Sequence, residues 1–97
     1  MVKESHSLTC PCCGYKTIDE EFEICDVCLW EHEPVQERRL DDDGGPNRVS
    51  LRQAQQNFAR FGLSMGGPDP LLGSLEERTA VYERDPDWKP FAPIVNG

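Results

Sequence analysis

Five cysteines, all between Cys10 and Cys28, are the residues best suited to chemistry in this 97-residue chain. Four of them form two C-x-x-C pairs, Cys10 with Cys13 and Cys25 with Cys28, separated by the eleven residues 14–24. Two residues between cysteines let the chain turn tightly and aim both sulfurs at one point. Two facing pairs supply four thiolates in a tetrahedron, the closed arrangement of a structural zinc site. The sequence therefore predicts one structural Zn²⁺ bound by Cys10, Cys13, Cys25 and Cys28.

Other metals and ligands fit this pattern less well. Iron in a rubredoxin-like site uses the same four sulfurs, but rubredoxins separate their pairs by more chain and place glycine after the second pair, where this sequence has Leu29. His6 and His32 each lie four residues outside the cysteine pairs. Because four cysteines already complete the site, we expect both histidines at the surface and not on the metal.

Cys12 is the extra thiol, and two interpretations of it stay open. It neighbours Cys13, so its side chain is expected to point away from the metal, as a partly exposed packing cysteine. The alternative is a redox-active thiol, because C-P-x-C resembles a thioredoxin-type motif. The βαβ pattern of thioredoxins is missing, and the segment is acidic where a reactive thiol needs an electropositive setting. The packing interpretation is therefore favoured.

Composition narrows the class of protein. The length suits one small domain, 1–97, and the mean hydropathy of −0.62 indicates a small apolar core that needs a metal to stabilise it. Residues 1–8 contain no apolar run, and nothing approaches the roughly 20 apolar residues of a membrane span. We therefore expect a cytoplasmic protein without membrane contact, whose thiols stay reduced.

Acidic residues dominate the charge, which is formally −8. Residues 19–43 hold 11 of the 18 acids, against only Arg38 and Arg39. This segment has two interpretations that stay open: contact with a basic protein partner, or charge that keeps a small protein soluble. It argues against nucleic-acid binding, because phosphate contacts need clustered Lys and Arg. No H-E-x-x-H, G-x-S-x-G or phosphate-loop motif occurs, so no enzyme activity is expected.

The remaining sequence predicts the elements that hold the cysteines. A cysteine knuckle module spans 8–30, with a β-hairpin whose strands surround a turn at 19–21. A helix is predicted over 50–62, with Ser50 as N-cap and Gly62 as C-terminal stop, and a weaker helix over 74–84. An extended tail, 86–97, carries apolar residues and is expected to dock. The aromatic residues expected to cover the metal site are Tyr15, Phe22 and Trp30. The predicted fold is small α+β: a zinc-ribbon-like knuckle β-hairpin packed with one or two helices and an extended C-terminal tail.

Three segments together resemble one known family. They are Cys10-Pro11-Cys12-Cys13-Gly14-Tyr15, the run from Glu23 to Glu31 with Cys25-Asp26-Val27-Cys28-Leu29-Trp30, and the stretch from Asn47 to Gly62. They resemble the bacterial cysteine-rich CPCC family over about residues 8–62. The resemblance implies zinc binding by Cys10, Cys13, Cys25 and Cys28, and it implies no assigned activity.

Three functions are compatible with these sequence features. The favoured one is a structural-zinc module whose acidic surface engages a protein partner, of the inhibitor or immunity type. The second is a nucleic-acid-binding zinc ribbon, an analogy from fold. The third is a thiol redox or metal-handling protein that uses Cys12. The sequence leaves the partner and the oligomeric state open.

Overall fold

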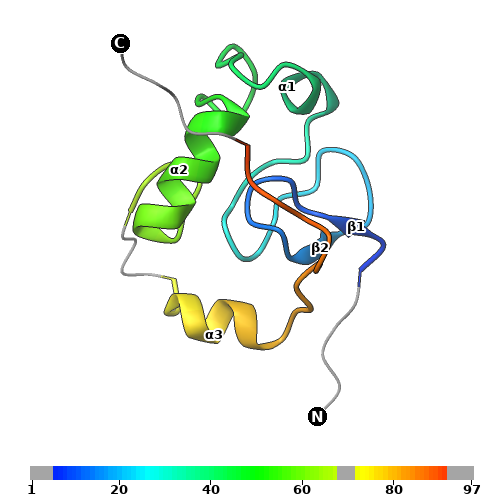
Figure 1. The fold of residues 1–97 in the computed structure, drawn as a ribbon, viewed down its shortest axis with the longest axis vertical. Coiled ribbons are helices and arrows are strands. Elements are labelled where there is room, and N and C mark those ends of the chain that lie inside the picture. Colours follow the sequence, from blue (N-terminus) through cyan, green and yellow to red (C-terminus); the bar gives the residue numbers. More distant parts are fainter. Residues whose placement is uncertain (1–5, 68–71, 92–97) are drawn as a thin grey trace.

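Short strands come first and helices follow in this fold. The computed structural model describes residues 6–67 and 72–91. Its elements are β1 Leu8–Thr9, β2 Lys16–Ile18, α1 Pro34–Arg38, α2 Leu51–Phe61 and α3 Leu75–Ala80. In Figure 1, α2 and α3 lie to the left of and below the blue and cyan loops that carry the cysteines. This is the small α+β fold that the sequence predicted.

The hairpin forms at a different place from the one predicted. Strand β1 pairs antiparallel with β2, Leu8 opposite Ile18, so the hairpin encloses the first cysteine pair. The predicted partner of β2, residues 22–24, instead lies against the chain after the second pair, where Ile24 bridges Glu31. The predicted pairing was wrong because each C-x-x-C turn brings its own flanking residues together.

The structure confirms the predicted bounds of the long helix, α2. The Ser50 side chain accepts a hydrogen bond from the Gln53 N–H, and Gly62 ends α2 in the left-handed conformation at φ 80°. The Gln53 side chain does not return to the cap, since it donates to Asn57 Oδ1 at 3.0 Å. Asn57 in turn donates to the Ser64 carbonyl at 2.8 Å and fixes the loop that follows the helix.

Helix α3 begins as predicted and ends early. The Ser74 side chain caps it by accepting from the Glu77 N–H, but the helix stops at Ala80 and not near 84. Beyond that point the chain joins the edge of β2, where the Lys16 N–H donates to the Glu83 carbonyl at 2.8 Å. Backbone bonds to a neighbouring segment replace the bonds that a further helical turn would have made.

Helix α1 was not predicted from the sequence. Glu33 caps it by accepting from the Gln36 N–H, and Pro34 stands at the first helical position. A Glu-Pro start with an acid in the first turn is a recognisable signal. At five residues the helix is too short to show apolar periodicity.

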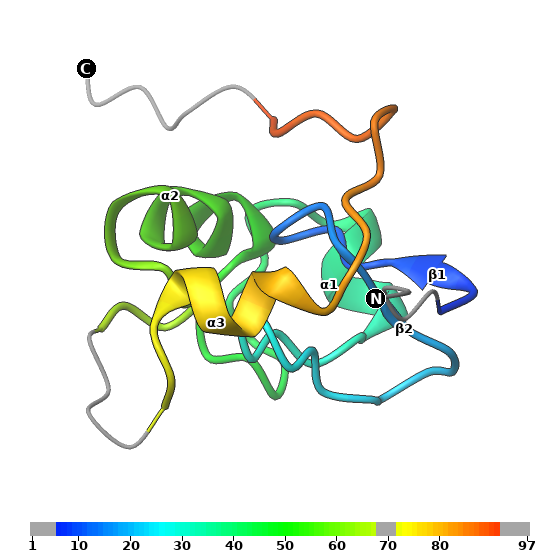
Figure 2. The same ribbon diagram turned by 90° about the horizontal axis from the view of Figure 1, so that it is seen from below.

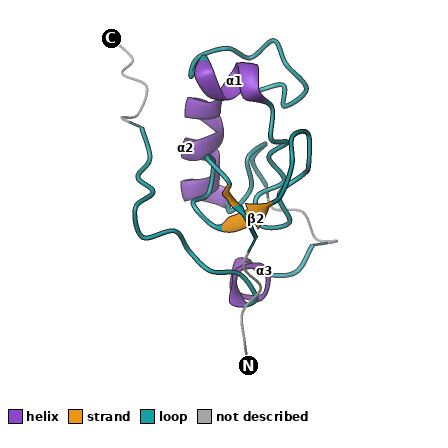
Figure 3. Ribbon diagram, turned by 90° about the vertical axis from the view of Figure 1, so that its right-hand side faces the viewer, coloured by secondary structure: helices purple, strands orange, loops and turns teal. Residues whose placement is uncertain are grey.

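The hydrophobic core is built around the cysteines. All five are buried, and together with Trp30, which is 0% exposed, they form most of one cluster. Its other buried members are Ile18, Val27, Tyr82, and Leu51 and Ala54 of α2. Loops, teal in Figure 3, carry most of this cluster. Trp30 and the half-buried Tyr15 take the predicted covering positions. Phe22 does not: it is 58% exposed, because a left-handed backbone (φ 66°) turns it outward.

The tail docks through Trp88. Its indole Nε1 donates to the Pro11 carbonyl at 3.0 Å, and the Phe91 N–H donates to the Gln55 side chain at 2.8 Å. Figure 2 shows this orange segment passing above the blue loop of the first cysteine pair. The apolar residues Ile94 and Val95, also predicted to dock, lie outside the described residues.

Replacing Gly14 tests how closely Trp88 seats. Gly14 and Gly66 both have a left-handed backbone, with φ +82° and +86°. A Cβ at Gly14 would lie 2.5 Å from Trp88 Cε3, whereas a Cβ at Gly66 would have no neighbour nearer than 3.9 Å. Gly66→Ala therefore carries only the left-handed strain, about 1 kcal/mol. Gly14→Ala should also displace Trp88, for a total of about 3 kcal/mol. Denaturant unfolding gives both values, and tryptophan emission should shift to the red only in Gly14→Ala. Equal losses in the two variants would contradict tight seating of Trp88.

Within residues 6–67 and 72–91, no helix has the length and apolar character needed to cross a bilayer.

Candidate metal centre

The structure brings together the four sulfurs of the two C-x-x-C pairs. Their Sγ atoms all lie within 4.8 Å of one another, and all four residues are buried. Cys10 Sγ is 3.6 Å from Cys28 Sγ, and Cys13 Sγ is 3.7 Å from Cys25 Sγ. Each of these contacts joins one pair to the other. All five cysteines are free thiols.

These separations suit a tetrahedral metal ion. Zinc–sulfur bonds of about 2.3 Å place neighbouring sulfurs of a tetrahedron about 3.8 Å apart. The measured 3.6 and 3.7 Å are close to that value, and both are far longer than an S–S bond of about 2.05 Å. Neither histidine belongs to this cluster, since His6 Nδ1 contacts Asp19 and His32 Nδ1 contacts Glu37. Both are half-buried and are not the surface residues that were expected. Among the described residues, sulfur is the only donor type in this cluster.

The two pairs are held by the same backbone pattern. In the first knuckle, residues 10–15, the Gly14 N–H donates to the Cys10 carbonyl and the Cys10 N–H to the Tyr15 carbonyl, both at 2.9 Å. In the second knuckle, residues 25–30, the Leu29 N–H donates to the Cys25 carbonyl and the Cys25 N–H to the Trp30 carbonyl, again at 2.9 Å. Gly14 (φ 82°) and Leu29 (φ 69°) therefore occupy equivalent left-handed positions.

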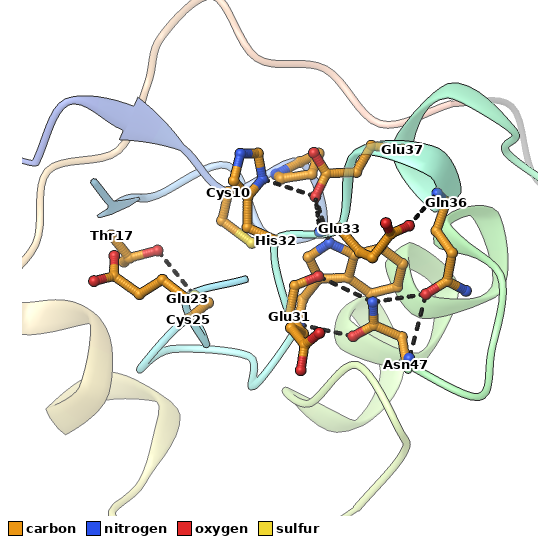
Figure 4. A network of polar contacts seen from close by, with 12 residues as sticks. Cys10, Thr17, Glu23, Cys25, Glu31, His32, Glu33, Gln36, Glu37 and Asn47 are labelled. Atoms are coloured by element: carbon orange, nitrogen blue, oxygen red, sulfur yellow. Dashed lines mark hydrogen bonds and ion pairs between the residues drawn. The ribbon is translucent and has the colours of Figure 1, made fainter. Parts of the chain in front are cut away.

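Hydrogen bonds to sulfur prepare the site for thiolates. The Val27 N–H donates to Cys25 Sγ at 3.3 Å and the Trp30 N–H to Cys28 Sγ at 3.4 Å. The Thr17 hydroxyl, from β2, donates to Cys25 Sγ at 3.0 Å, as Figure 4 shows. Donors aimed at a sulfur stabilise its charged form.

Burial of the cysteines disfavours the charged thiolate form. It raises the pKa of the Cys10 and Cys28 thiols well above the ordinary value. The pKa of Cys25 is lowered, first by the neighbouring Cys10 thiol and then by Cys13, Cys28 and Thr17. Burial therefore opposes the accumulation of negative charge on these sulfurs. Four thiolates in this cluster require a positive ion.

Cys12 lies outside the metal cluster, as predicted, but it is not partly exposed. Its side chain is 0% exposed and belongs to the core. The first knuckle turns beneath α2 and the tail, where Gln55 and Trp88 both donate to the Pro11 carbonyl. Cys12 is thus buried with the rest of the first knuckle.

Glu37 of α1 links this helix to the second knuckle. Its Oε2 accepts from Trp30 Nε1 at 2.9 Å, from the Glu33 N–H at 3.1 Å, and contacts His32 Nδ1 at 2.8 Å (Figure 4). The Glu37 side chain is only 15% exposed. This acid therefore positions Trp30 over the cysteines and is not available to a partner.

A second polar network fixes the loop between α1 and α2. The buried Gln36 donates from Nε2 to the Asp42 and Val49 carbonyls at 2.9 and 3.0 Å. Its Oε1 accepts from the Asn47 N–H and side-chain Nδ2. Asn47 continues the network by exchanging two hydrogen bonds with the backbone of Glu31. Sequence reasoning missed this network, because buried amides have no periodic signal.

The acids of residues 19–43 divide into two groups. Seven of them accept hydrogen bonds within the fold: Asp19, Glu23, Asp26, Glu33, Glu37, Asp41 and Asp42. The bonds from His6 and Ser7 to Asp19 lower the pKa of that carboxyl. The hydrogen bonds between described residues leave four carboxylates unused, those of Glu20, Glu21, Glu31 and Asp43. These four are the acids most available for contact.

Comparison with known proteins agrees with the cysteine pattern. The sequence model of a family described as Cysteine-rich CPCC matches residues 8–67. The match covers both knuckles, α1 and α2, and it ends before α3. No curated protein matches this chain.

Proposed function

This chain belongs to the cysteine-rich CPCC family, and from that premise we propose that it is a protein-binding module organised by one structural Zn²⁺. The observation that carries the proposal is the set of four buried sulfurs within 4.8 Å of one another. Cys10, Cys13, Cys25 and Cys28 hold the ion. When bound, it supplies the positive charge that lets four buried thiolates coexist.

Zinc is proposed over iron on the local chemistry. The second knuckle has Leu29 where rubredoxin-like iron sites carry glycine, and the two knuckles are close in sequence. Protein purified without added metal should contain one zinc per chain by native mass spectrometry. A chain containing iron, with the visible absorption of an iron–thiolate site, would overturn the zinc assignment and leave the ligand set intact.

The proposed role is non-catalytic, in a reducing compartment such as the cytoplasm. A catalytic zinc keeps a coordination position for water or substrate, and four thiolates leave none. The buried sulfurs also suit a compartment that keeps thiols reduced, since oxidation would remove the ligands.

The partner proposed for this module is a basic protein. Support comes from the net charge of the chain, which is −8. Zinc binding would make this charge more negative by two, since four thiolates and one Zn²⁺ sum to −2. The unused carboxylates of Glu20, Glu21, Glu31 and Asp43 lie on the loops around the second knuckle and α1. A basic surface, such as the active cleft of a nuclease, is complementary to them, as in an inhibitor or immunity protein.

Neutralising part of this group tests the acidic contact. The triple variant Glu20→Gln, Glu21→Gln, Asp43→Asn should recover specific partners at least tenfold less well in affinity capture, because it removes three of the four unused carboxylates. The matched variant Glu76→Gln, Glu83→Gln, Asp87→Asn removes the same charge from α3 and the tail. Its recovery should stay within twofold of wild type. If the two variants lost recovery equally, binding would depend on the net charge and not on these particular carboxylates.

The two other functions receive less support. Arg52 pairs with Asp41 at 2.8 Å, and Arg78 donates to the carbonyls of Val27, Gly62 and Gly73, so these bases have roles within the fold. A nucleic-acid site would need such side chains to contact the phosphates of the nucleic acid. A redox role for Cys12 needs an accessible thiol, and this one is enclosed.

A further inference from the structure

The two knuckles share one backbone pattern but have different outer surfaces. At the first knuckle, the left-handed position is Gly14, and the Trp88 ring lies where its Cβ would be. At the second knuckle, the same position is Leu29, whose side chain is 37% exposed. This chain therefore covers the first knuckle with its own tryptophan. The second knuckle presents an apolar side chain.

Leu29 is an unfavourable residue for its position on structural grounds. A left-handed backbone strains every residue with a Cβ, and glycine removes that strain. Glycine would also remove the exposed leucine. The fold thus has a less strained solution, which it uses at Gly14. Backbone strain of this kind concentrates at binding sites, where a side chain must be aimed in a fixed direction.

Other exposed apolar side chains surround Leu29. Together with Ile24 (53% exposed) and Met65 (52% exposed), it lines an open hollow of about 250 Å³. Arg48, a second non-glycine residue with a left-handed backbone (φ 62°), lies on the rim. The third such residue, Phe22, comes two residues before Ile24 and is 58% exposed. Leu29 and Arg48, two of the three non-glycine residues with a left-handed backbone in the described chain, thus line this hollow.

We propose that the hollow lined by Ile24, Leu29 and Met65 docks an apolar side chain of a basic protein partner, which covers the second knuckle as Trp88 covers the first. This inference rests on the proposed function and adds the contact surface and its chemistry. Charge decides whether a basic partner or a second copy of this chain occupies this surface. Glu31 and Arg48 both line the hollow, so the net charge of the whole chain, −8, decides. A second copy of this chain, at −8, would bring repelling charge, whereas Lys or Arg beside the apolar side chain would be attracted.

Peptide selection tests the surface directly and requires no identified partner. The probe is a library of random 12-residue peptides displayed on phage, selected on the zinc-loaded full chain and counter-selected on Leu29→Asn. Asparagine tolerates the left-handed backbone, so this variant removes the apolar side chain and keeps the turn. We expect enriched peptides that combine an aromatic or aliphatic residue with Lys or Arg. They should bind Leu29→Asn and Ile24→Thr at least tenfold more weakly than wild type.

The matched control is Val81→Thr, which removes an apolar side chain of similar exposure (44%) from the end of α3. Its affinity for the selected peptides should stay within twofold of wild type. Native mass spectrometry must show one zinc in each variant. Ile24→Thr lies outside the C-x-x-C turn, so it keeps the test valid if Leu29→Asn loses metal.

Several outcomes would overturn the docking proposal. The first is an enriched pool that does not distinguish wild type from Leu29→Asn and Ile24→Thr. The second is a set of discriminating peptides that are acidic or lack apolar residues. A concentration-dependent dimer in sedimentation, lost in Leu29→Asn, would identify a second copy as the occupant instead. Failure of the zinc proposal is separate, because it would appear as protein without metal before any peptide is tested.

Discussion

Removing the metal is expected to unfold residues 8–67, the region that contains both knuckles and α2. The core of this region consists largely of the cysteines themselves, so little apolar burial remains to hold it when they separate. Structural zinc in small domains binds with about 10–16 kcal/mol, comparable to the whole stability of a typical domain, about 5–15 kcal/mol. A chelator should therefore abolish the cooperative thermal transition and the near-ultraviolet signal of Trp30. Readdition of Zn²⁺ should restore both.

The adjacent cysteines Cys12 and Cys13 supply a matched control for this result. Both are buried, but only Cys13 belongs to the four-sulfur cluster. Cys13→Ala should lose the metal and the cooperative transition. Cys12→Ala should keep one metal ion per chain and lose only the packing of one small side chain, about 1 kcal/mol. A chain that stays folded after chelation, or equal losses in the two variants, would show that the cluster acts as a core and not as a metal site.

Gln36→Leu is expected to give the next largest loss, about 4 kcal/mol of unfolding free energy. This buried amide has four hydrogen-bond partners: the carbonyls of Asp42 and Val49, and the N–H and side-chain Nδ2 of Asn47. Leucine fills a similar volume and leaves all four groups without that partner, at about 1 kcal/mol or more each. Denaturant unfolding of the zinc-loaded protein measures the change.

Gln53→Leu is the control for the amide-to-leucine change. Gln53 is half-buried on α2, and its side chain makes one bond, to Asn57. Water can replace that bond, so the expected loss is below about 1 kcal/mol. If Gln36→Leu were as mild as Gln53→Leu, the loop of residues 39–50 would not depend on the amide network.

Local signals in the sequence predicted much of this protein. The two C-x-x-C pairs predicted four converging sulfurs, and the caps Ser50 and Gly62 predicted α2 to the residue. Both signals act within a few residues, since a tight turn aims two thiols and a side chain caps its own helix. The binding of zinc by these sulfurs stays a prediction. The start of α3 at Ser74 and the docking of Trp88 were also within reach of the sequence.

Contacts between distant segments decided the rest. Strands β1 and β2 pair around the first knuckle, and an isolated bridge joins Ile24 to Glu31 around the second. The Glu83 carbonyl ends α3 early by accepting from the Lys16 N–H. Glu37, counted as a surface acid from the sequence, is held against Trp30. These outcomes share one physical reason. A buried polar or backbone group must find a hydrogen-bond partner, and the partner depends on which segments the fold brings together.

The sequence alone thus determined which residues converge, because turns and caps are settled by near neighbours. The tertiary structure decided which surface each knuckle presents. The first knuckle is covered because the tail, more than 70 residues later, places Trp88 against Gly14. The second knuckle presents Leu29 because the described part of the chain packs no comparable aromatic ring against it. Both depend on packing between segments far apart in the chain, which no local pattern of residues encodes.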